Sequence, residues 1–195
     1  GPKAAALGGA YTARSGEPTS MFYNPAGMAG VRRYEMMGTY ESLYTGLSDS
    51  SSIGRNVFAL AMPLRFRTHY FGGLGIGMNS MSLSGLYKES TALLSYAYPV
   101  SRRMSMGVTM RQLSVEYGSD PYTAVNPMFK KGNSKAAMGM DFGVLYQFRL
   151  LDVGFSVLNF NQPDVGIAYP NPVERQIKAG MHFVRGVWNW DVSVA

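Results

Sequence analysis

Hydrophobic residues alternate with small or polar residues along much of this chain. The clearest run covers residues 138–148, where Met, Phe, Val and Tyr fill nearly every second position and Gly, Asp, Leu and Gln lie between them. Similar runs begin at Met104, Val153, Ile177 and Trp188. Because successive side chains of a β-strand point to opposite faces of a sheet, these runs predict strands with one apolar face and one small or polar face.

Four earlier segments predict further strands, although their alternation is less regular. They cover residues 34–44, 56–62, 69–78 and 91–98 and are rich in Tyr, Leu, Phe and Gly. Between Met110 and Leu113 the alternation changes phase, which predicts a β-bulge. The sequence therefore predicts an all-β fold, with about nine antiparallel strands across residues 34–195.

The predicted connections alternate between short and long. Short connections fall at residues 63–68, 99–103, 148–151 and 185–186, and long ones at 46–54, 82–89, 118–135 and 161–175. Transmembrane β-barrels of the up-and-down type have short periplasmic turns and long extracellular loops. Arginine recurs in the short turns, either as an ordinary polar turn residue or as a contact to phospholipid head groups. These arginines are Arg65, Arg67, Arg102, Arg103, Arg149 and Arg185.

A transmembrane barrel explains this pattern, because only helices or closed sheets satisfy their backbone hydrogen bonds in hydrocarbon. The chain has no run of about 18 apolar residues that would form a membrane helix. Aromatic residues lie near strand ends, as in the girdles at a membrane interface. The alternative is a soluble β-sheet binding protein, whose apolar faces would meet in a shared core. Its net charge of +6 would then form a basic surface.

Residues 1–33 lack the alternation and predict an N-terminal plug, or hatch, segment ahead of the strands. Asn24 and Pro25 are a preferred cap and first residue of a short helix. An apolar cluster in this segment either contacts a hydrophobic ligand or packs the plug against the wall. The candidate ligand-binding residues are Met21, Phe22, Tyr23, Asn24, Pro25 and Met28.

Two stretches resemble a known family. Residues 7–13 (LGGAYTA) and 21–29 (MFYNPAGMA), with a polar stretch between them, resemble the N-terminal signature of FadL-like outer-membrane β-barrels, and most closely the branch with PorV and PorQ. Residues 154–160 and 172–181 are similar to a later strand pair of that family. The resemblance implies a barrel of about fourteen strands in the bacterial outer membrane, with this chain as an N-terminal part that is incomplete at its C-terminal end.

The resemblance implies two functions. One is passive transport of hydrophobic small molecules past a plug and through a lateral exit. The other is a membrane scaffold or shuttle for secreted or surface proteins. The expected partners are accordingly outer-membrane lipids, together with a hydrophobic ligand or proteins of a secretion or surface assembly, and no nucleic acid.

The small or polar face of the strands would line the lumen. Four charged residues fall on it by the alternation, and the aspartates among them either pair with Lys178 or Arg111 across the interior or hold water. The predicted lumen residues are Asp141, Asp152, Lys178 and Asp191.

The sequence predicts no enzyme, no cofactor and no metal site. It lacks cysteine, and its two histidines, His69 and His182, are far apart. The glycine run at residues 72–77 lies within a strand and is not followed by a helix, as a nucleotide-binding loop requires. We expect these glycines to pack closely against the plug.

Overall fold

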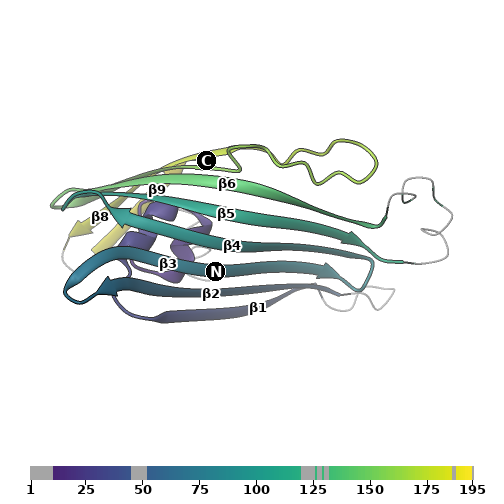
Figure 1. Ribbon diagram of the computed structural model, residues 1–195, viewed down its shortest axis with the longest axis horizontal. Helices are drawn as coiled ribbons and strands as arrows, with labels where there is room; N and C mark the ends of the chain where they lie inside the picture. Colours follow the sequence, from purple (N-terminus) through teal and green to yellow (C-terminus); the bar gives the residue numbers. More distant parts are fainter. Residues whose placement is uncertain are drawn as a thin grey trace.

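The computed structural model describes residues 11–44, 52–119, 126, 129, 132–185 and 188–194, with side chains up to Phe183. Within these residues, nine antiparallel strands form one sheet in which each strand pairs with its neighbours in the sequence (Figure 1). β1 and β9 lie at its two edges. The strands are β1 (Glu35–Tyr44), β2 (Ile53–Phe66), β3 (His69–Leu83), β4 (Tyr87–Pro99), β5 (Met104–Tyr117), β6 (Ser134–Gln147), β7 (Leu151–Leu158), β8 (Gln176–Arg185) and β9 (Trp188–Val194). The all-β, up-and-down prediction is thereby confirmed.

The predicted alternation sets the two faces of the sheet. In β6, Met140 and Phe142 are exposed, whereas Asp141, which lies between them, and Gly143, which follows them, are buried. We call the side of Met140 and Phe142 the outer face and the opposite side the inner face. Other large apolar residues exposed on the outer face are Met36, Tyr40, Phe58, Ile76, Met78, Leu94, Met106, Val108, Met110, Phe155, Ile177 and Met181.

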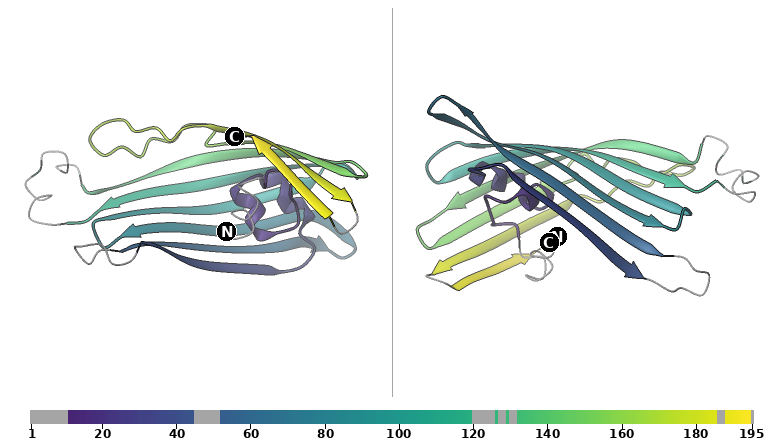
Figure 2. Two further views of the ribbon diagram at one scale, coloured as in Figure 1. Left: turned by 180° about the vertical axis from the view of Figure 1, so that it is seen from behind. Right: turned by 90° about the horizontal axis from the view of Figure 1, so that it is seen from below.

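The inner face is covered in part by residues 11–31, which we call the N-terminal segment (Figure 2). It contains two 3-10 helices, η1 (Pro18–Phe22) and η2 (Pro25–Gly30). Asn24 caps η2, since its side-chain oxygen accepts a hydrogen bond from the Ala26 amide at 3.0 Å. None of the described helices is long and apolar enough to cross a bilayer.

The predicted bulge between Met110 and Leu113 is wrong. β5 pairs with both β4 and β6 in continuous register through these residues. Leu113 lies on the inner face, next to Gly139 and Pro163. The inner face therefore carries an apolar residue at this position, and an inward leucine was mistaken for a change of phase.

The predicted long connection at residues 82–89 is also wrong. β3 continues to Leu83 and β4 begins at Tyr87, which leaves a three-residue turn in which Ser84 and Gly85 have positive φ angles of 33° and 77°. These strand ends carry polar residues on both faces, so the alternation disappears before the strand does. The same effect makes β2 longer than the predicted 56–62.

The described sheet has two register shifts, the first with an extra residue in β1 and the second with an extra residue in β3. One falls between Ser42 and Tyr44 and the other between Pro63 and Arg65. At the second shift, Leu64 of β2 stands against Phe71 and Gly72 of β3, and the positive φ of Gly72 (107°) is one that glycine supplies at a β-bulge.

The turns after β2, β4 and β6 lie at one end of the sheet, which we call the short-turn end. The connections after β5 and β7 are long, as predicted. The predicted long connection at residues 46–54 lies mostly outside the described residues.

Candidate functional site on the inner face

The N-terminal segment is held to the inner face by two fully buried methionines. Met21 from η1 and Met28 from η2 are both 0% exposed and pack with Val31, Leu93 and alanines of β2 and β4. A Cβ on Gly75 would lie only 2.6 Å from the terminal methyl carbon of each methionine. Glycine at this position therefore lets the thioether side chains reach the sheet.

Glycines line the rest of this contact. A side chain on Gly107 would overlap the Pro25 backbone, and one on Gly143 would overlap the Asn24 side chain. A side chain on Gly154 would meet the backbone of Thr12. The close packing expected for the glycine run at residues 72–77 is present at Gly73, Gly75 and Gly77, which all touch the segment.

Asn24 joins the segment to β6 as well as capping η2. Its side-chain nitrogen donates hydrogen bonds to the carbonyl oxygens of Thr12 at 2.7 Å and Val144 at 3.1 Å. Asn24 is fully buried, and every hydrogen-bonding group of its amide has a partner. A buried amide satisfied in this way fixes the position of the segment along the sheet.

The predicted ligand-binding residues fall into two groups. Met21, Asn24, Pro25 and Met28 are buried between the segment and the sheet, whereas Phe22 and Tyr23 keep part of their surface exposed.

Tyr23 lies against β7 and β8. Its carbonyl oxygen accepts a hydrogen bond from the Ser156 hydroxyl at 2.7 Å, and the Lys178 ammonium nitrogen lies 5.6 Å from the centre of its ring. Burial raises the pKa of the Tyr23 hydroxyl, so this group is neutral at physiological pH.

Hydrogen bonds within the N-terminal segment brace its first turn. The Tyr11 hydroxyl donates to the Glu17 carboxylate and accepts from the Thr19 hydroxyl at 2.9 Å. Burial, followed by the hydrogen bond to Glu17, raises the pKa of Tyr11. Because its proton is held between two oxygens in a buried site, Tyr11 acts here as a structural donor.

A charged cluster lies on the inner face beside Tyr23. Arg111 donates from Nε to Oδ2 of Asp141, which is 0% exposed, and Oδ1 of Asp141 accepts from the Asn159 amide at 2.8 Å. Arg111 Nη2 and Asn159 Oδ1 are buried and have no hydrogen-bond partner among the described residues. With Lys178 nearby, two cations surround one carboxylate, so the cluster carries a net positive charge.

The remaining predicted lumen residues lie at the β7–β8–β9 part of the sheet. Asp152 is half-buried on the inner face and stands opposite His182 in the ladder. Asp191 pairs with His182 in the backbone register, but its side chain lies outside the described residues. The register thus brings Asp141 together with Arg111 and places Asp152 in a separate position. In the described part of the chain, no three His, Asp or Glu residues form a group that could hold a metal ion.

A comparison with protein-family models decides the family. The model described as type IX secretion system membrane protein PorP/SprF matches residues 18–194. The chain belongs to the PorP/SprF family. It is a type IX secretion protein of the bacterial outer membrane. Neither the curated proteins nor the solved structures contain a match to this chain.

Membership of the PorP/SprF family confirms the coarser part of the sequence prediction. An outer-membrane protein was expected, with a scaffold for secreted or surface proteins as one of its two possible functions, and the alternative of a soluble binding protein is excluded by this location. The match is to PorP/SprF and not to the FadL-like barrels named from the motifs.

One structural feature of this PorP/SprF chain was missed from the sequence. β7 ends at Leu158 and pairs only with residues 142–147 of β6, so β6 extends beyond its neighbour. Beyond that point the Asn161 side chain replaces a strand residue: its oxygen accepts from the Met140 amide at 3.0 Å and its nitrogen donates to the Met138 carbonyl at 2.8 Å. The turn residues before Pro163 were a signal for the end of β7, but not for this contact.

Proposed function

We propose that the nine strands form part of the wall of a closed outer-membrane barrel, with lipid on the outer face and the N-terminal segment as a plug on the inner face. The exposed Met, Phe and Ile side chains of the outer face support a lipid contact, because a barrel in a bilayer needs an apolar exterior. The edges at β1 and β9 support further strands, because an unpaired edge is costly in hydrocarbon. A fourteen-stranded barrel remains our prediction for the whole wall.

We further propose that this barrel is a scaffold that holds protein partners of the type IX secretion assembly. The observation that carries this proposal is the locked N-terminal segment. Met21 and Met28 are fully buried, Asn24 has all its hydrogen bonds, and glycines are placed where the segment touches the sheet. A plug attached in this way suits a closed barrel that presents fixed surfaces to other proteins.

Transport of hydrophobic molecules has less support from the same residues. The two methionines expected to contact such a ligand use their surface to anchor the segment. The inner face beside them carries the Arg111–Asp141 pair, which is poorly suited to an apolar solute. The charged groups of that pair also engage each other, and we propose no catalytic role for them.

Conductance and surface display together test the scaffold proposal. In planar bilayers, the intact protein should be closed, and the pair of substitutions Met21→Asp and Met28→Asp should give open channels. In the native bacterium, deletion of the gene should reduce the amount of specific surface proteins, and re-expression should restore it. Uptake of labelled fatty acid into proteoliposomes above that of empty vesicles, with unchanged surface proteins in the deletion strain, would contradict the scaffold and favour transport.

A further inference from the structure

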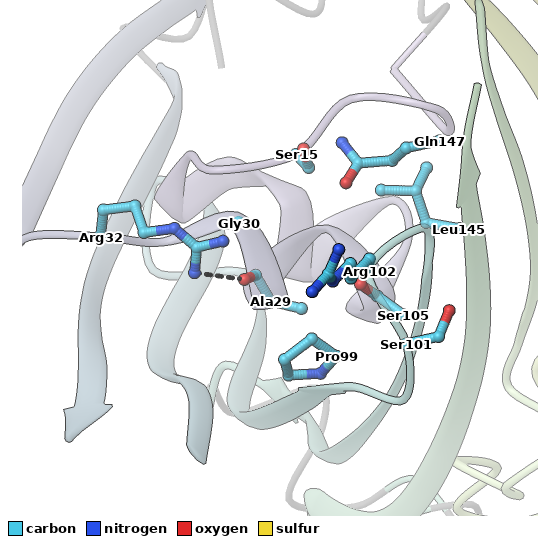
Figure 3. Close-up of a pocket in the computed structure, with 10 residues that line it drawn as sticks. All are labelled: Ser15, Ala29, Gly30, Arg32, Pro99, Ser101, Arg102, Ser105, Leu145 and Gln147. Atoms are coloured by element: carbon cyan, nitrogen blue, oxygen red, sulfur yellow. Dashed lines mark hydrogen bonds between the residues drawn. The ribbon is translucent and has the colours of Figure 1, made fainter. Parts of the chain in front are cut away.

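A cavity of about 140 Å³ lies on the inner face at the short-turn end of the sheet (Figure 3). It lies between the end of η2, at Ala29 and Gly30, and the turn that joins β4 to β5. Leu145 and Gln147 at the end of β6 contribute a further side. The cavity is therefore bounded by the N-terminal segment, the β4–β5 turn and the ends of β5 and β6, and the charged cluster around Asp141 takes no part in it.

Two arginines line this cavity. Arg32 is fixed, because it donates to the Ala29 carbonyl at 3.1 Å and its guanidinium lies 4.4 Å from the centre of the Tyr70 ring. Arg102 comes from the β4–β5 turn and lies between Ala29 and Ser105 in the close-up (Figure 3). Its guanidinium has no hydrogen-bond or ion-pair partner among the described residues. The cavity is therefore lined by one anchored cation and one cation that is available to a ligand, and both arginines are exposed to solvent.

The other polar side chains of the cavity are three hydroxyls and the Gln147 amide, which is hydrogen-bonded to Asp152 behind it. Ser15, Ser101 and Ser105 contribute hydroxyls, and no acidic residue lines the cavity. The Ser101 oxygen already accepts from the Arg103 amide at 3.2 Å and the Met104 amide at 3.0 Å, which leaves its hydroxyl hydrogen to donate. Arginine and hydroxyl donors without a carboxylate match an oxyanion, and the forked guanidinium matches a carboxylate in particular.

The location of the cavity argues against a lipid head group as its occupant. Ser105, Leu145 and Gln147 are on the inner face, alternating with the outward Met106 and Tyr146. The cavity thus opens away from the outer face. More arginines lie at the same end of the sheet outside the cavity, and together they attract a partner with several carboxylates more strongly than a single small anion, while each contributes little by itself. These are Arg65, Arg67, Arg103 and Arg149.

We propose that this cavity is a carboxylate-binding site that docks an acidic segment of a periplasmic protein onto the short-turn end of the barrel. The periplasmic assignment rests on the proposed barrel orientation, in which short turns face the periplasm. The binding chemistry depends only on the cavity itself.

Binding of a labelled peptide tests the site on the intact protein. The probe is a fluorescein-labelled hexaglutamate, measured by anisotropy with protein in nanodiscs of zwitterionic lipid at about 50 mM salt, where ion pairs are weakly screened. Arg102→Gln should weaken binding about tenfold, the loss expected for a charge-assisted contact. Arg149→Gln, which removes a turn arginine outside the cavity, should weaken it less than about twofold. Hexaglutamine should not bind.

Three results would overturn the proposal. Equal weakening by the two substitutions would show a diffuse positive rim without a site. Displacement of the peptide by inorganic phosphate at an equal concentration of charge would show a site for small anions. Capture of phosphatidylglycerol vesicles by the wild type, lost in Arg102→Gln, would show a lipid contact.

The orientation of the barrel in the membrane is tested in a separate experiment. The chain has no cysteine, so a single introduced cysteine can be labelled selectively. An Arg149→Cys variant should resist a membrane-impermeant maleimide added to intact cells. Labelling from outside would overturn the periplasmic assignment and the barrel orientation while leaving the measured peptide binding in place.

Discussion

Glycine at the inner face decides how closely the N-terminal segment approaches the sheet. At Gly143 the missing side chain leaves the space that the Asn24 amide fills, and at Gly107 it leaves space for the backbone of η2. Overpacking of these contacts forces backbone shifts, because hydrogen bonds hold the Asn24 amide in place and the contact at Gly107 is to backbone atoms. The free energy of docking is therefore sensitive to a single methyl group.

Gly143→Ala should lower the free energy of unfolding by about 1–3 kcal/mol, since its methyl group would overlap the buried Asn24 side chain. Thermal unfolding in detergent and protease cleavage within residues 11–31 measure the effect. Gly38→Ala is the matched control, because a Cβ there has nothing within 4 Å. Identical unfolding temperatures for the two variants would contradict the docking contact described here.

The Arg111–Asp141 pair makes a second prediction. Asp141→Leu leaves the Arg111 guanidinium buried without its carboxylate and should destabilise the protein by about 3–5 kcal/mol. The double variant Arg111→Met with Asp141→Leu should recover most of this loss, because neither charge is then left unpaired. Denaturant unfolding of the three proteins measures both effects, and a double variant no more stable than Asp141→Leu would count against the pair.

The alternation of residue types predicted that Asp141 faces inward, but it left the partner undecided between Arg111 and Lys178. The choice depends on strand register, which places Thr109 opposite Asp141 and so brings Arg111 within reach on the adjacent strand. Register follows from the turns and from contacts to the N-terminal segment, and neither is visible in a single strand. The cavity beside Arg102 was missed for the same reason, since its walls come from three separate elements.

At the scale of the elements, the connection between β7 and β8 is fastened to β6 by an ion pair. Asp164 accepts from the Lys135 ammonium at 2.8 Å and from the amides of Asn171 at 2.7 Å and Gly166 at 3.0 Å. The hydrogen bond from Lys135, and then those from the two amides, lower the pKa of Asp164 to about 2. A carboxylate with a lowered pKa stabilises the folded state above the pKa it has in the unfolded chain, and this contribution is lost as the pH falls through 2.

A titration of the Asp164 carboxyl carbon by NMR should accordingly show a midpoint near pH 2. In Lys135→Gln the midpoint should rise toward the ordinary value of 3.8, because the first cause of the shift is removed. The backbone amides should hold it somewhat below that value. Midpoints that agree in the two proteins would show that the ion pair does not form in solution.

The elements themselves were largely predictable where one face is apolar. The strands at residues 104–117, 134–147 and 151–158 were predicted close to their observed bounds, because a buried inner face and an exposed apolar face differ in composition. The ends of β2, β3 and β4 that lie away from the short-turn end were not predicted. Arg55, Asn79 and Lys88 belong there to stretches with polar residues on both faces. The alternation of apolar and polar residues predicts a strand only where its two faces lie in different environments. It does not reveal a strand whose two faces are both polar.

At the scale of the whole molecule, the proposed lipid contact of the outer face predicts that this face decides assembly in the membrane. Phe142→Arg should lower the free energy of unfolding in the membrane by about 2–4 kcal/mol if this position lies near the middle of the bilayer. We expect less protein in the outer-membrane fraction and loss of the compact, heat-modifiable band on gel electrophoresis. Phe142→Leu, which keeps an apolar side chain, is the control. Equal assembly of both variants would reverse the assignment of the two faces.

Methionine supplies much of that outer face, and this has a consequence for the life of the protein before it reaches the membrane. Met36, Met78, Met106, Met110, Met138, Met140 and Met181 are all exposed there. Oxidation to the sulfoxide would give each of them a polar group. If peroxide oxidised the polypeptide before insertion, the proposed barrel would thus place polar sulfoxides against the hydrocarbon of the bilayer, which solvates them poorly. Repair by a sulfoxide reductase would therefore have to precede insertion.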